Sequence, residues 1–509
     1  MLLVVTLAAL AWTLWRDSGD EPRTKRAAPP PAAPGRHVEV VVQDDAQLRE
    51  APPERIRQAT EQLAALGVDR IRFTGAWVGL APAPDSPVKP VFDESDPASY
   101  SAAGWAKLDT AVRETVRAGM QPMIDVSFWA PRWAVQRPSR EPGQGRWRPS
   151  PGDFGRFAAA LATRYSGRYV DPASGRALPA VRLWTTWNEP NHPAFLLPQW
   201  ERRDGRWLPA SPHWYRAMHE AADAAIVAAD PRNRVLIGGL SSIGYDKPGV
   251  AARMTPLRFV RELACVDARL RPLTRPECRG YEPLRADGFA IHPYGFSLPP
   301  DGAPALPGNL TMGRLPRLAA LLDALYRRGR LAQPLPLYVT ELGWESNPPD
   351  PYRGVPLETQ ARYLSQSMDI AWHEPDLRMT AWYLLRDIPP DSAVPPDSRP
   401  YWRTFQTGLE FADGTPKPAL QALAMPLSIE RDAAGGYRAW GRVAAGTGAR
   451  RVSFELQAPD GSWTAASPPL RTRADGTIER TLTAMGSYRL RWDPPSGRPR
   501  WSLAVSTGS

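Results

Sequence analysis

Two glutamates stand in settings where a carboxylate can take part in catalysis. Glu189 lies in the string WNEPNH at 187–192, and Glu341 lies in VTELGW at 339–344. Cleavage of a glycosidic bond needs two carboxyl groups that face one pocket. One donates a proton to the leaving oxygen, and the other attacks the anomeric carbon or activates a water molecule. The two strings therefore raise the hypothesis of glycosidic bond cleavage, provided that the fold brings the two glutamates together.

The pattern along the chain predicts how these glutamates are positioned. Short β-branched or apolar runs alternate with stretches whose apolar residues recur at helical spacing. The runs that predict strands lie at 37–42, 68–73, 122–128, 180–187, 234–239, 286–292, 336–342 and 379–385. The stretches that predict helices include 53–67, 103–119, 213–229, 315–329 and 357–372, and Gly67, Gly119 and Gly329 stand at the ends of three of them.

Eight strands that alternate with helices predict an α/β fold, a (β/α)8 TIM barrel over residues 37–425, in preference to an open doubly wound sheet. Catalytic residues of such barrels lie at the carboxyl ends of the strands. Glu189 follows the fourth predicted strand and Glu341 closes the seventh, and these strands face each other across the mouth of the barrel. We therefore expect the two carboxylates to converge.

The two ends of the chain predict additional segments. Residues 426–509 alternate in polarity between Gly, Asp and Pro turns with no helical stretch, which predicts a small C-terminal all-β sandwich domain. Residues 1–36 form an apolar signal-like or anchor-like segment followed by a Pro-rich linker. The apolar part is shorter than the roughly 20 residues that span a membrane comfortably. We expect an extracellular protein, secreted or tethered to the membrane by this segment.

Two cysteines, Cys265 and Cys278, lie close together in the sequence. Each could be a buried thiol, but their proximity and the loop-like residues between them favour a local disulfide. A disulfide implies an oxidising compartment, in agreement with export.

Several other functions lack their sequence signals. The formal net charge of +10 is spread along the chain, without a basic run or a nucleic-acid-binding motif, so no nucleic acid is expected as a partner. No phosphate-binding glycine loop follows a predicted strand, and no GxSxG motif occurs. The six histidines form no HxH or HExxH pattern, so no metal and no cofactor are expected. We expect a monomer whose partner is a carbohydrate substrate.

The strings around Glu189 and Glu341 resemble those of clan A glycoside hydrolases, the retaining barrels with carboxylates after strands 4 and 7. The resemblance is closest to family 39-like enzymes, with family 5 next, and covers about residues 37–425. It implies that Glu189 is the acid/base and Glu341 the nucleophile of a double displacement. It also implies that Asn188 hydrogen-bonds the sugar 2-hydroxyl.

Further site residues follow from the same resemblance. Arg72 would lie beneath the nucleophile and keep it ionised, and Tyr294 would hydrogen-bond Glu341. His292 would line the pocket, and Trp382 would form a platform for the sugar. One departure concerns the third strand, where family 5 enzymes usually carry a histidine and this chain reads DVSFWAPRW.

Aromatic residues near the predicted strand ends are candidate sugar contacts. We name Trp129, Trp187 and Trp344 for this role, because indole faces stack on sugar rings. The alternative is that these side chains only close the core of the barrel. For the C-terminal sandwich, bracing of the barrel is favoured over carbohydrate binding.

Long rims at 129–152 and 191–212 can build extended subsites, which favours cleavage within a polysaccharide over removal of terminal sugars. The arginines in these rims suggest anionic sugars. Two rival functions are considered. One is a non-catalytic glycan-binding barrel of a polysaccharide assembly system, and the other is a transglycosylase that uses the same residues with a sugar as acceptor.

Overall fold

The computed structural model describes residues 37–137, 143–432 and 435–508. The N-terminal segment at 1–36, predicted to be a signal or anchor, lies outside the described residues. Among the helices in the described ranges, none combines the length and the apolarity needed to cross a bilayer. The chain divides into two compact units, His37–Gly343 with Asp376–Leu385, and Trp344–Pro375 with Arg386–Ser509.

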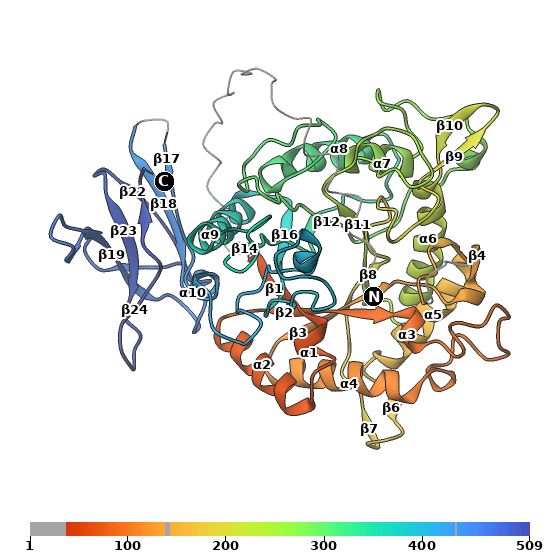
Figure 1. Ribbon diagram of the computed structural model, residues 1–509, viewed down its shortest axis with the longest axis horizontal. Coiled ribbons are helices and arrows are strands. Elements are labelled where there is room, and N and C mark those ends of the chain that lie inside the picture. The colour runs from red at the N-terminus through yellow and green to blue at the C-terminus, as the bar shows by residue number, and fades with distance from the viewer. Residues whose placement is uncertain (1–36, 138–142, 433–434, 509) are drawn as a thin grey trace. The chain divides into compact units, whose positions relative to one another are not determined.

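The first unit contains a closed barrel of eight parallel strands, which confirms the predicted TIM-barrel fold (Figure 1). The order around the barrel is β1-β16-β13-β12-β11-β8-β3-β2. The strands are β1 (Glu39–Gln43), β2 (Arg70–Ala76), β3 (Gln121–Ser127), β8 (Leu183–Thr186), β11 (Arg234–Ser241), β12 (Gly288–His292), β13 (Leu337–Val339) and β16 (Leu377–Tyr383). Each overlaps one of the eight runs that predict strands.

Helices surround the strand ring in Figure 1. Those of the first unit are α1 (Asp45–Leu48), α2 (Pro53–Ala65), α3 (Trp77–Leu80), α4 (Ala102–Arg117), α5 (Pro151–Arg164), α6 (Ser211–Ala229), α7 (Pro256–Leu263) and α8 (Leu315–Arg327). Local sequence explains their ends. The Ser101 side chain caps the start of α4 by accepting a hydrogen bond from the Gly104 amide. Gly119 then ends this helix at a φ of 84°, a conformation that side chains with a Cβ rarely adopt.

The interior of the barrel is apolar. Seven of the eight strands contribute to one buried cluster, which consists of Val41, Met123, Leu183, Leu236, Ala290, Tyr338, Met379 and Ala381. This filled interior is a packed core and not a channel. The polar side chains described below lie beyond it, at the carboxyl ends of the strands.

Two hairpins extend the loops at the carboxyl ends of β3 and β8. β4 (Val135–Arg137) pairs with β5 (Trp147–Pro149), and β9 (Trp200–Arg203) pairs with β10 (Arg206–Pro209). The sequence pattern predicts loops for both stretches. The Asp-Gly pair at 204–205 has positive φ at both residues, which is the turn that joins β9 to β10 and is a recognisable hairpin signal.

Cys265 and Cys278 form a disulfide in the segment between α7 and β12, as predicted. His213 lies near the two sulfur atoms, and these three residues are a group with the residue types of a metal site among the described residues. Both sulfurs are committed to the disulfide, so they offer no thiolate to a metal.

The second unit contains the C-terminal strands, which form two packed sheets. The first sheet consists of β17 (Leu427–Arg431), β18 (Tyr437–Arg442) and β22 (Thr477–Leu482). The second consists of β19 (Arg451–Gln457), β20 (Trp463–Ala465), β21 (Leu470–Arg471), β23 (Ser487–Trp492), β24 (Arg500–Trp501) and β25 (Val505–Ser506). Val452, Phe454 and Leu490 are fully buried between them. The all-β character of this C-terminal region agrees with the sequence prediction.

The second unit also includes α9 (Leu357–His373) and α10 (Pro418–Ala424), which precede the predicted boundary at residue 425. Ion pairs join α9 to the first sheet. Arg438 binds Asp369 through two nitrogens at 2.9 and 2.8 Å, and His373 lies 3.3 Å from Glu479. Burial opposes protonation of His373, but its contacts with Asp369 and Glu479 raise the pKa of His373 to about 9.

Candidate active site

Glu341 lies just beyond the carboxyl end of β13, where two side chains hold its carboxylate. Arg72 donates a hydrogen bond from Nη1 to Oε1 at 2.6 Å, and the Tyr294 hydroxyl donates to Oε2 at 3.2 Å. Burial by itself raises the pKa of Glu341, but the nearby His292 and Arg72 and the two hydrogen bonds outweigh it. The net effect lowers the pKa of Glu341, so the carboxylate is kept ionised.

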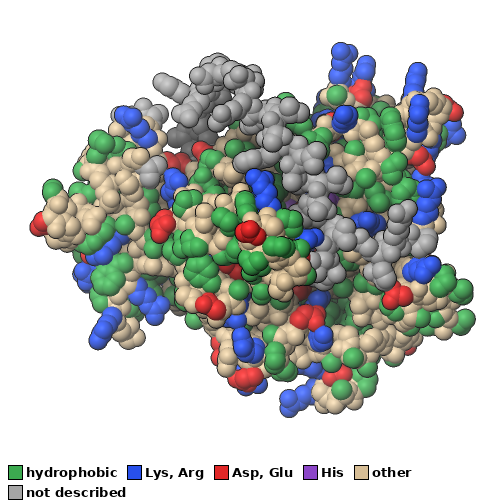
Figure 2. Space-filling view, in the orientation of Figure 1, with side chains coloured by type: hydrophobic (Ala, Val, Ile, Leu, Met, Phe, Trp, Pro, Cys, Tyr) green, Lys and Arg blue, Asp and Glu red, His purple; other side chains and the backbone are tan. Residues whose placement is uncertain are grey.

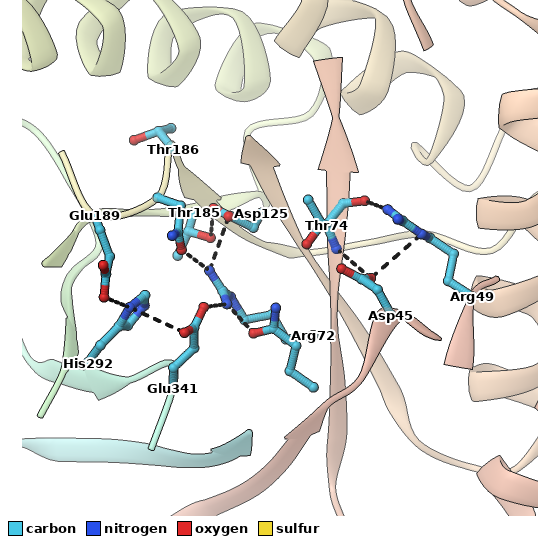
Figure 3. A network of polar contacts seen from close by, with 12 residues as sticks. Asp45, Arg49, Arg72, Thr74, Asp125, Thr185, Thr186, Glu189, His292 and Glu341 are labelled. Atoms are coloured by element: carbon cyan, nitrogen blue, oxygen red, sulfur yellow. Dashed lines mark hydrogen bonds and ion pairs between the residues drawn. The ribbon is translucent and has the colours of Figure 1, made fainter. Parts of the chain in front are cut away.

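Arg72, on β2, is the centre of the polar network in Figure 3. Its side chain is 1% exposed, and besides Glu341 it contacts Gln43 Oε1, Asp125 Oδ2 at 3.1 Å and Asn188 Oδ1 at 3.4 Å. Burial lowers the pKa of Arg72, and the charges of Asp125 and Glu341 reverse this, so the pKa of Arg72 is raised overall. The guanidinium therefore stays charged beside the Glu341 carboxylate, and the role that the resemblance implies for Arg72 stays a prediction.

Asp125 is a site residue that the sequence analysis did not single out. It lies near the end of β3 and is 1% exposed, and it accepts a hydrogen bond from the Thr185 hydroxyl at 2.6 Å. Burial raises the pKa of Asp125, and Arg72 opposes this without cancelling it. A signal was present in the sequence, because an aspartate inside an apolar strand must find a partner in the core.

Glu189 lies on the loop after β8, in a backbone of unusual conformation. Trp187 has a φ of 64° and Glu189 a φ of 39°, both in the left-handed region. Hydrogen bonds fix this turn, from the Trp187 amide to Val126 O at 2.7 Å and from the Glu189 amide to Gly239 O at 2.9 Å. Strained backbone that neighbouring strands hold in place is frequent at functional sites.

A bulge in β11 supplies the acceptor for the Glu189 amide. The register of β11 against β12 shifts between Gly238 and Leu240. Gly238 has a φ of 113°, and a Cβ at this position would lie 2.4 Å from Ala290 O. Only glycine fits here, and the bulge turns the carbonyl of Gly239 toward the loop that carries Glu189.

His292, at the end of β12, lies between the two carboxylates (Figure 3). Its Nδ1 is 3.2 Å from Glu189 Oε1 and 3.6 Å from Glu341 Oε2. Those two oxygens are therefore no further apart than about 7 Å, which admits the separation of about 5–5.5 Å that a retaining mechanism requires. The side chains of Glu189 and Glu341 are 14% and 12% exposed, so both reach the surface.

The structure brings together Arg72, Asn188, Glu189, His292, Tyr294 and Glu341, all of which the sequence analysis named. Asn188 is buried, and its Oδ1 accepts from Arg72. Burial and the adjacent charge of Glu341 raise the pKa of Tyr294 well above its ordinary value, so its hydroxyl remains a donor. Trp382 lies on β16 and is 4% exposed, and its role as a sugar platform remains a prediction.

The other aromatic candidates occupy different settings. Trp129 is half-buried, and its indole N–H donates to Ala194 O at 2.9 Å on the loop that follows Glu189. Trp187 is fully buried, with its ring against Phe154. Trp344 belongs to the second unit, is 1% exposed and packs against Tyr363. The burial of Trp187 and Trp344 favours the alternative that they close the core, and their contact with a sugar stays a prediction.

Comparison with known proteins gives only structural similarities. No protein-family model matches the sequence, and no curated protein matches it. The chain is similar to a family 39 glycoside hydrolase from the gut symbiont Bacteroides cellulosilyticus WH2, with 17% identity, 89% of this chain and 80% of that chain covered, and a TM-score of 0.49.

The chain is also similar to two proteins described as GH5_18. The one from Bifidobacterium longum subsp. infantis has 18% identity over 79% of this chain and 84% of that chain, with a TM-score of 0.45. The one from Streptomyces cattleya, in complex with GlcNAc, has 14% identity over 76% and 79%, with a TM-score of 0.44. Families 39 and 5 are those that the two glutamate strings resemble. At these identities and TM-scores no conclusion about function rests on the similarity, and the side-chain geometry has to carry it.

Proposed function

We propose that this protein is a retaining glycoside hydrolase that cleaves O-glycosidic bonds of a glycan or polysaccharide by double displacement. The observation that supports it most is the position of His292, whose Nδ1 contacts both carboxylates. Two acidic side chains at one imidazole, of which one also binds a buried arginine, satisfy the geometry of glycosidic bond cleavage.

In the first step Glu341 attacks the anomeric carbon, and Glu189 donates its proton to the leaving oxygen. A covalent glycosyl-enzyme results, in which the Glu341 carboxylate has become an ester. Arg72 and Tyr294 supply the donors that hold the carboxylate before attack. Asn188, which Arg72 fixes through Oδ1, presents its amide N–H₂ group to the sugar 2-hydroxyl.

In the second step Glu189 acts as a base. It takes a proton from water, which attacks the anomeric carbon and releases Glu341 as a carboxylate. Glu189 thus changes its protonation state twice in each cycle. The Nδ1 of His292 can serve both states, since an imidazole nitrogen donates to a carboxylate or accepts from a carboxylic acid.

We also propose export to an extracellular location, by secretion or by an anchor at residues 1–36. The disulfide between Cys265 and Cys278 supports this, because such bonds persist in oxidising compartments. We also propose that the exported protein is a monomer. Protease accessibility of the protein on intact cells, with a cytoplasmic protein as control, tests the location.

The proposed chemistry is tested by chemical rescue. Parent, Glu189→Ala and Glu341→Ala proteins are assayed on a panel of aryl glycosides and polysaccharides, with and without azide. Azide should restore turnover of Glu341→Ala and give a glycosyl azide of inverted configuration, and Glu189→Ala should give the retained azide. Full turnover in either variant without azide would refute the assignment.

The panel also separates the proposed hydrolysis from its rivals. Nuclear magnetic resonance of the first product, taken before mutarotation, should show the substrate's anomeric configuration. Transfer to an added sugar in preference to water would indicate a transglycosylase. Binding of a glycan by the parent with no cleavage of that glycan would indicate a non-catalytic barrel.

A further inference from the structure

Three basic side chains accompany the loop that carries Glu189. They are Arg146, His192 and Arg253, and the proposed mechanism uses none of them. The His192 amide donates to Glu189 O at 2.8 Å, so His192 lies one turn beyond the proposed acid. The acid protonates the bond on its leaving-group side. Side chains on its own loop are therefore placed to contact the sugar that leaves.

Arg146 is tied to this loop by both its backbone and its side chain. Its carbonyl accepts from the Leu197 amide at 2.7 Å, and its Nη1 lies 3.5 Å from Ala194 O. The Trp129 indole donates to the same Ala194 oxygen at 2.9 Å. A half-buried guanidinium and a half-buried indole thus meet at one peptide group beside the active site.

His192 is joined to the same peptide. The Ala194 amide donates to His192 Nδ1 at 3.0 Å, so Nδ1 is an acceptor and the proton of the neutral ring is at Nε2. Burial, followed by the charges of Arg253 and Arg146, lowers the pKa of His192 well below its ordinary value. The ring is therefore a neutral donor whose Nε2–H has no acceptor among the described residues.

Arg253 approaches from the segment before α7. The amide of its neighbour Met254 donates to Asn191 O at 3.2 Å, and the Asn191 amide group donates to Met254 O at 3.0 Å. This pairing places Arg253 next to the residue that precedes His192.

Two arginines in or beside the β9–β10 hairpin, Arg203 and Arg148, provide a contrast. In Figure 2, basic side chains project at the edge where Figure 1 places this hairpin. Arg203 binds Glu201 at 2.7 Å and also contacts Glu277, and Arg148 beside the hairpin binds Glu201 at 2.8 Å. By contrast, no carboxylate within the described part of the chain is in ion-pair contact with Arg146 or Arg253. Within the described residues, these two half-buried cations are therefore available to pair with an anionic ligand.

We propose that Arg146, His192 and Arg253 form a subsite for an anionic substituent, a carboxylate or a sulfate ester, on the sugar at the leaving-group side of the cleaved bond. This inference rests on the proposed function. The two guanidinium groups supply charge and paired N–H donors, and His192 supplies a third donor. The adjacent Trp129 offers an indole for the sugar ring.

The test measures binding by the Glu341→Gln variant, which should bind without cleaving. The probes are a cello-oligosaccharide, the same oligosaccharide oxidised at its primary alcohols to carboxylates, and the same oligosaccharide sulfated at those positions. Titration calorimetry should show that at least one anionic probe binds roughly tenfold to a hundredfold more tightly than the neutral one. Tighter binding of the oxidised probe would indicate a carboxylate, and tighter binding of the sulfated probe would indicate a sulfate ester.

Two further measurements locate the effect. Adding Arg146→Met and Arg253→Met together should abolish the preference, and Arg206→Gln, which removes an exposed charge from β10, should leave it intact. In Glu341→Gln without other changes, added salt should weaken binding of the anionic probes and not of the neutral one. Equal binding of all probes, binding of none, or a preference that survives the double substitution would overturn the proposal.

Failure of this subsite is distinguishable from failure of the proposed function. Glu341-dependent hydrolysis of neutral aryl glycosides by the parent, without any anionic preference, would leave the proposed function intact and refute the subsite. Tight binding of an anionic probe, without hydrolysis of any substrate, would support the subsite and refute the proposed function.

Discussion

Glu341 and Glu189 carry the same functional group in two different settings. Glu341 contacts a buried arginine at 2.6 Å, a tyrosine hydroxyl at 3.2 Å and His292 at 3.6 Å. Glu189 has one side-chain contact in the described structure, with His292 at 3.2 Å. Its position is fixed through its backbone instead, by the strained turn after β8 and the bulge in β11.

This difference matches the roles that we propose for the two groups, Glu341 as nucleophile and Glu189 as acid/base. A nucleophile works in one protonation state, and surrounding donors hold Glu341 in that state. An acid/base must lose and regain a proton, and fixed donors around it would oppose one half of the cycle. A rigid backbone with a sparsely bonded side chain suits the acid/base role that we propose for Glu189.

Substitution of each glutamate by glutamine tests this division most strongly. Glu341→Gln should lower kcat by at least about a thousandfold for every substrate, because no other group can form the covalent bond. For Glu189→Gln the loss in kcat/KM should depend on the leaving group. It should be small for a dinitrophenyl glycoside, whose leaving oxygen needs no proton, and large for an alkyl glycoside.

Steady-state kinetics on a series of aryl glycosides measures both effects. A steeper dependence on leaving-group pKa in Glu189→Gln than in the parent is expected. An equal dependence in the two proteins would contradict the assignment of Glu189 as the acid.

Removal of Arg72 should leave Glu341 with fewer side-chain contacts, and its setting should then be more like that of Glu189. In Arg72→Met, Glu341 loses its closest cation, so the pKa of Glu341 rises. The acidic limb of the kcat/KM profile should then move to higher pH, by about one unit or more, and activity should fall roughly a hundredfold.

Arg70 provides the matched control for Arg72. It lies two residues earlier on β2, is also buried and binds Glu39 at 2.8 Å. Arg70→Met and Arg72→Met should both lower the melting temperature, but Arg70→Met should leave the acidic limb in place. A shift of the limb in the Arg70 variant would mean that loss of stability, not loss of the local charge, explains the profile.

Asp125→Asn should move the same limb in the opposite direction. The substitution keeps the shape of the side chain but removes the negative charge that Arg72 shares with Glu341. Arg72 then acts more strongly on Glu341, the pKa of Glu341 falls, and the limb moves to lower pH. The less basic nucleophile and the loosened arginine should reduce kcat/KM by about tenfold. A limb that moves upward would show that Asp125 only supports packing.

Much of this site could be predicted from the sequence because the barrel imposes a simple rule. Catalytic residues of such barrels lie at the carboxyl ends of the strands, and parallel strands bring those ends to one edge. Glu189, His292 and Glu341 obey this rule. The role of Arg72 came from the resemblance. In the structure, polar contacts with Gln43, Asp125 and Asn188, as well as Glu341, offset the free-energy cost of burying its guanidinium.

The residues that escaped prediction depend on contacts between distant segments. Asp125 carries no motif, and its role appears only when β2 lies beside β3. Trp187 stands next to Asn188 and Glu189, yet its positive φ turns it into the core. The grouping of α9 with the C-terminal sheets depends on the pairs from Arg438 to Asp369 and from His373 to Glu479, which no local pattern specifies.

The smallest expected effect concerns Tyr294, which contacts Glu341 and not Glu189. Its hydroxyl donates to Glu341 Oε2 at 3.2 Å, a long bond for an O–H donor, so Tyr294→Phe should reduce kcat/KM only about three- to tenfold. Because that bond lowers the pKa of Glu341, its loss should raise the acidic limb slightly, in the direction of Arg72→Met.

Tyr215→Phe is the control for Tyr294→Phe, since the Tyr215 hydroxyl is bound near the site by Thr186 O, the Gly238 amide and Thr186 Oγ1, and no hydrogen bond joins it to either glutamate among the described residues. It should cost stability without moving the limb. If Tyr294→Phe instead moved the limb as far as Arg72→Met, the tyrosine and not the arginine would be the main group that holds the nucleophile ionised. Glu341 would then depend on one neutral donor, much as Glu189 depends on one imidazole.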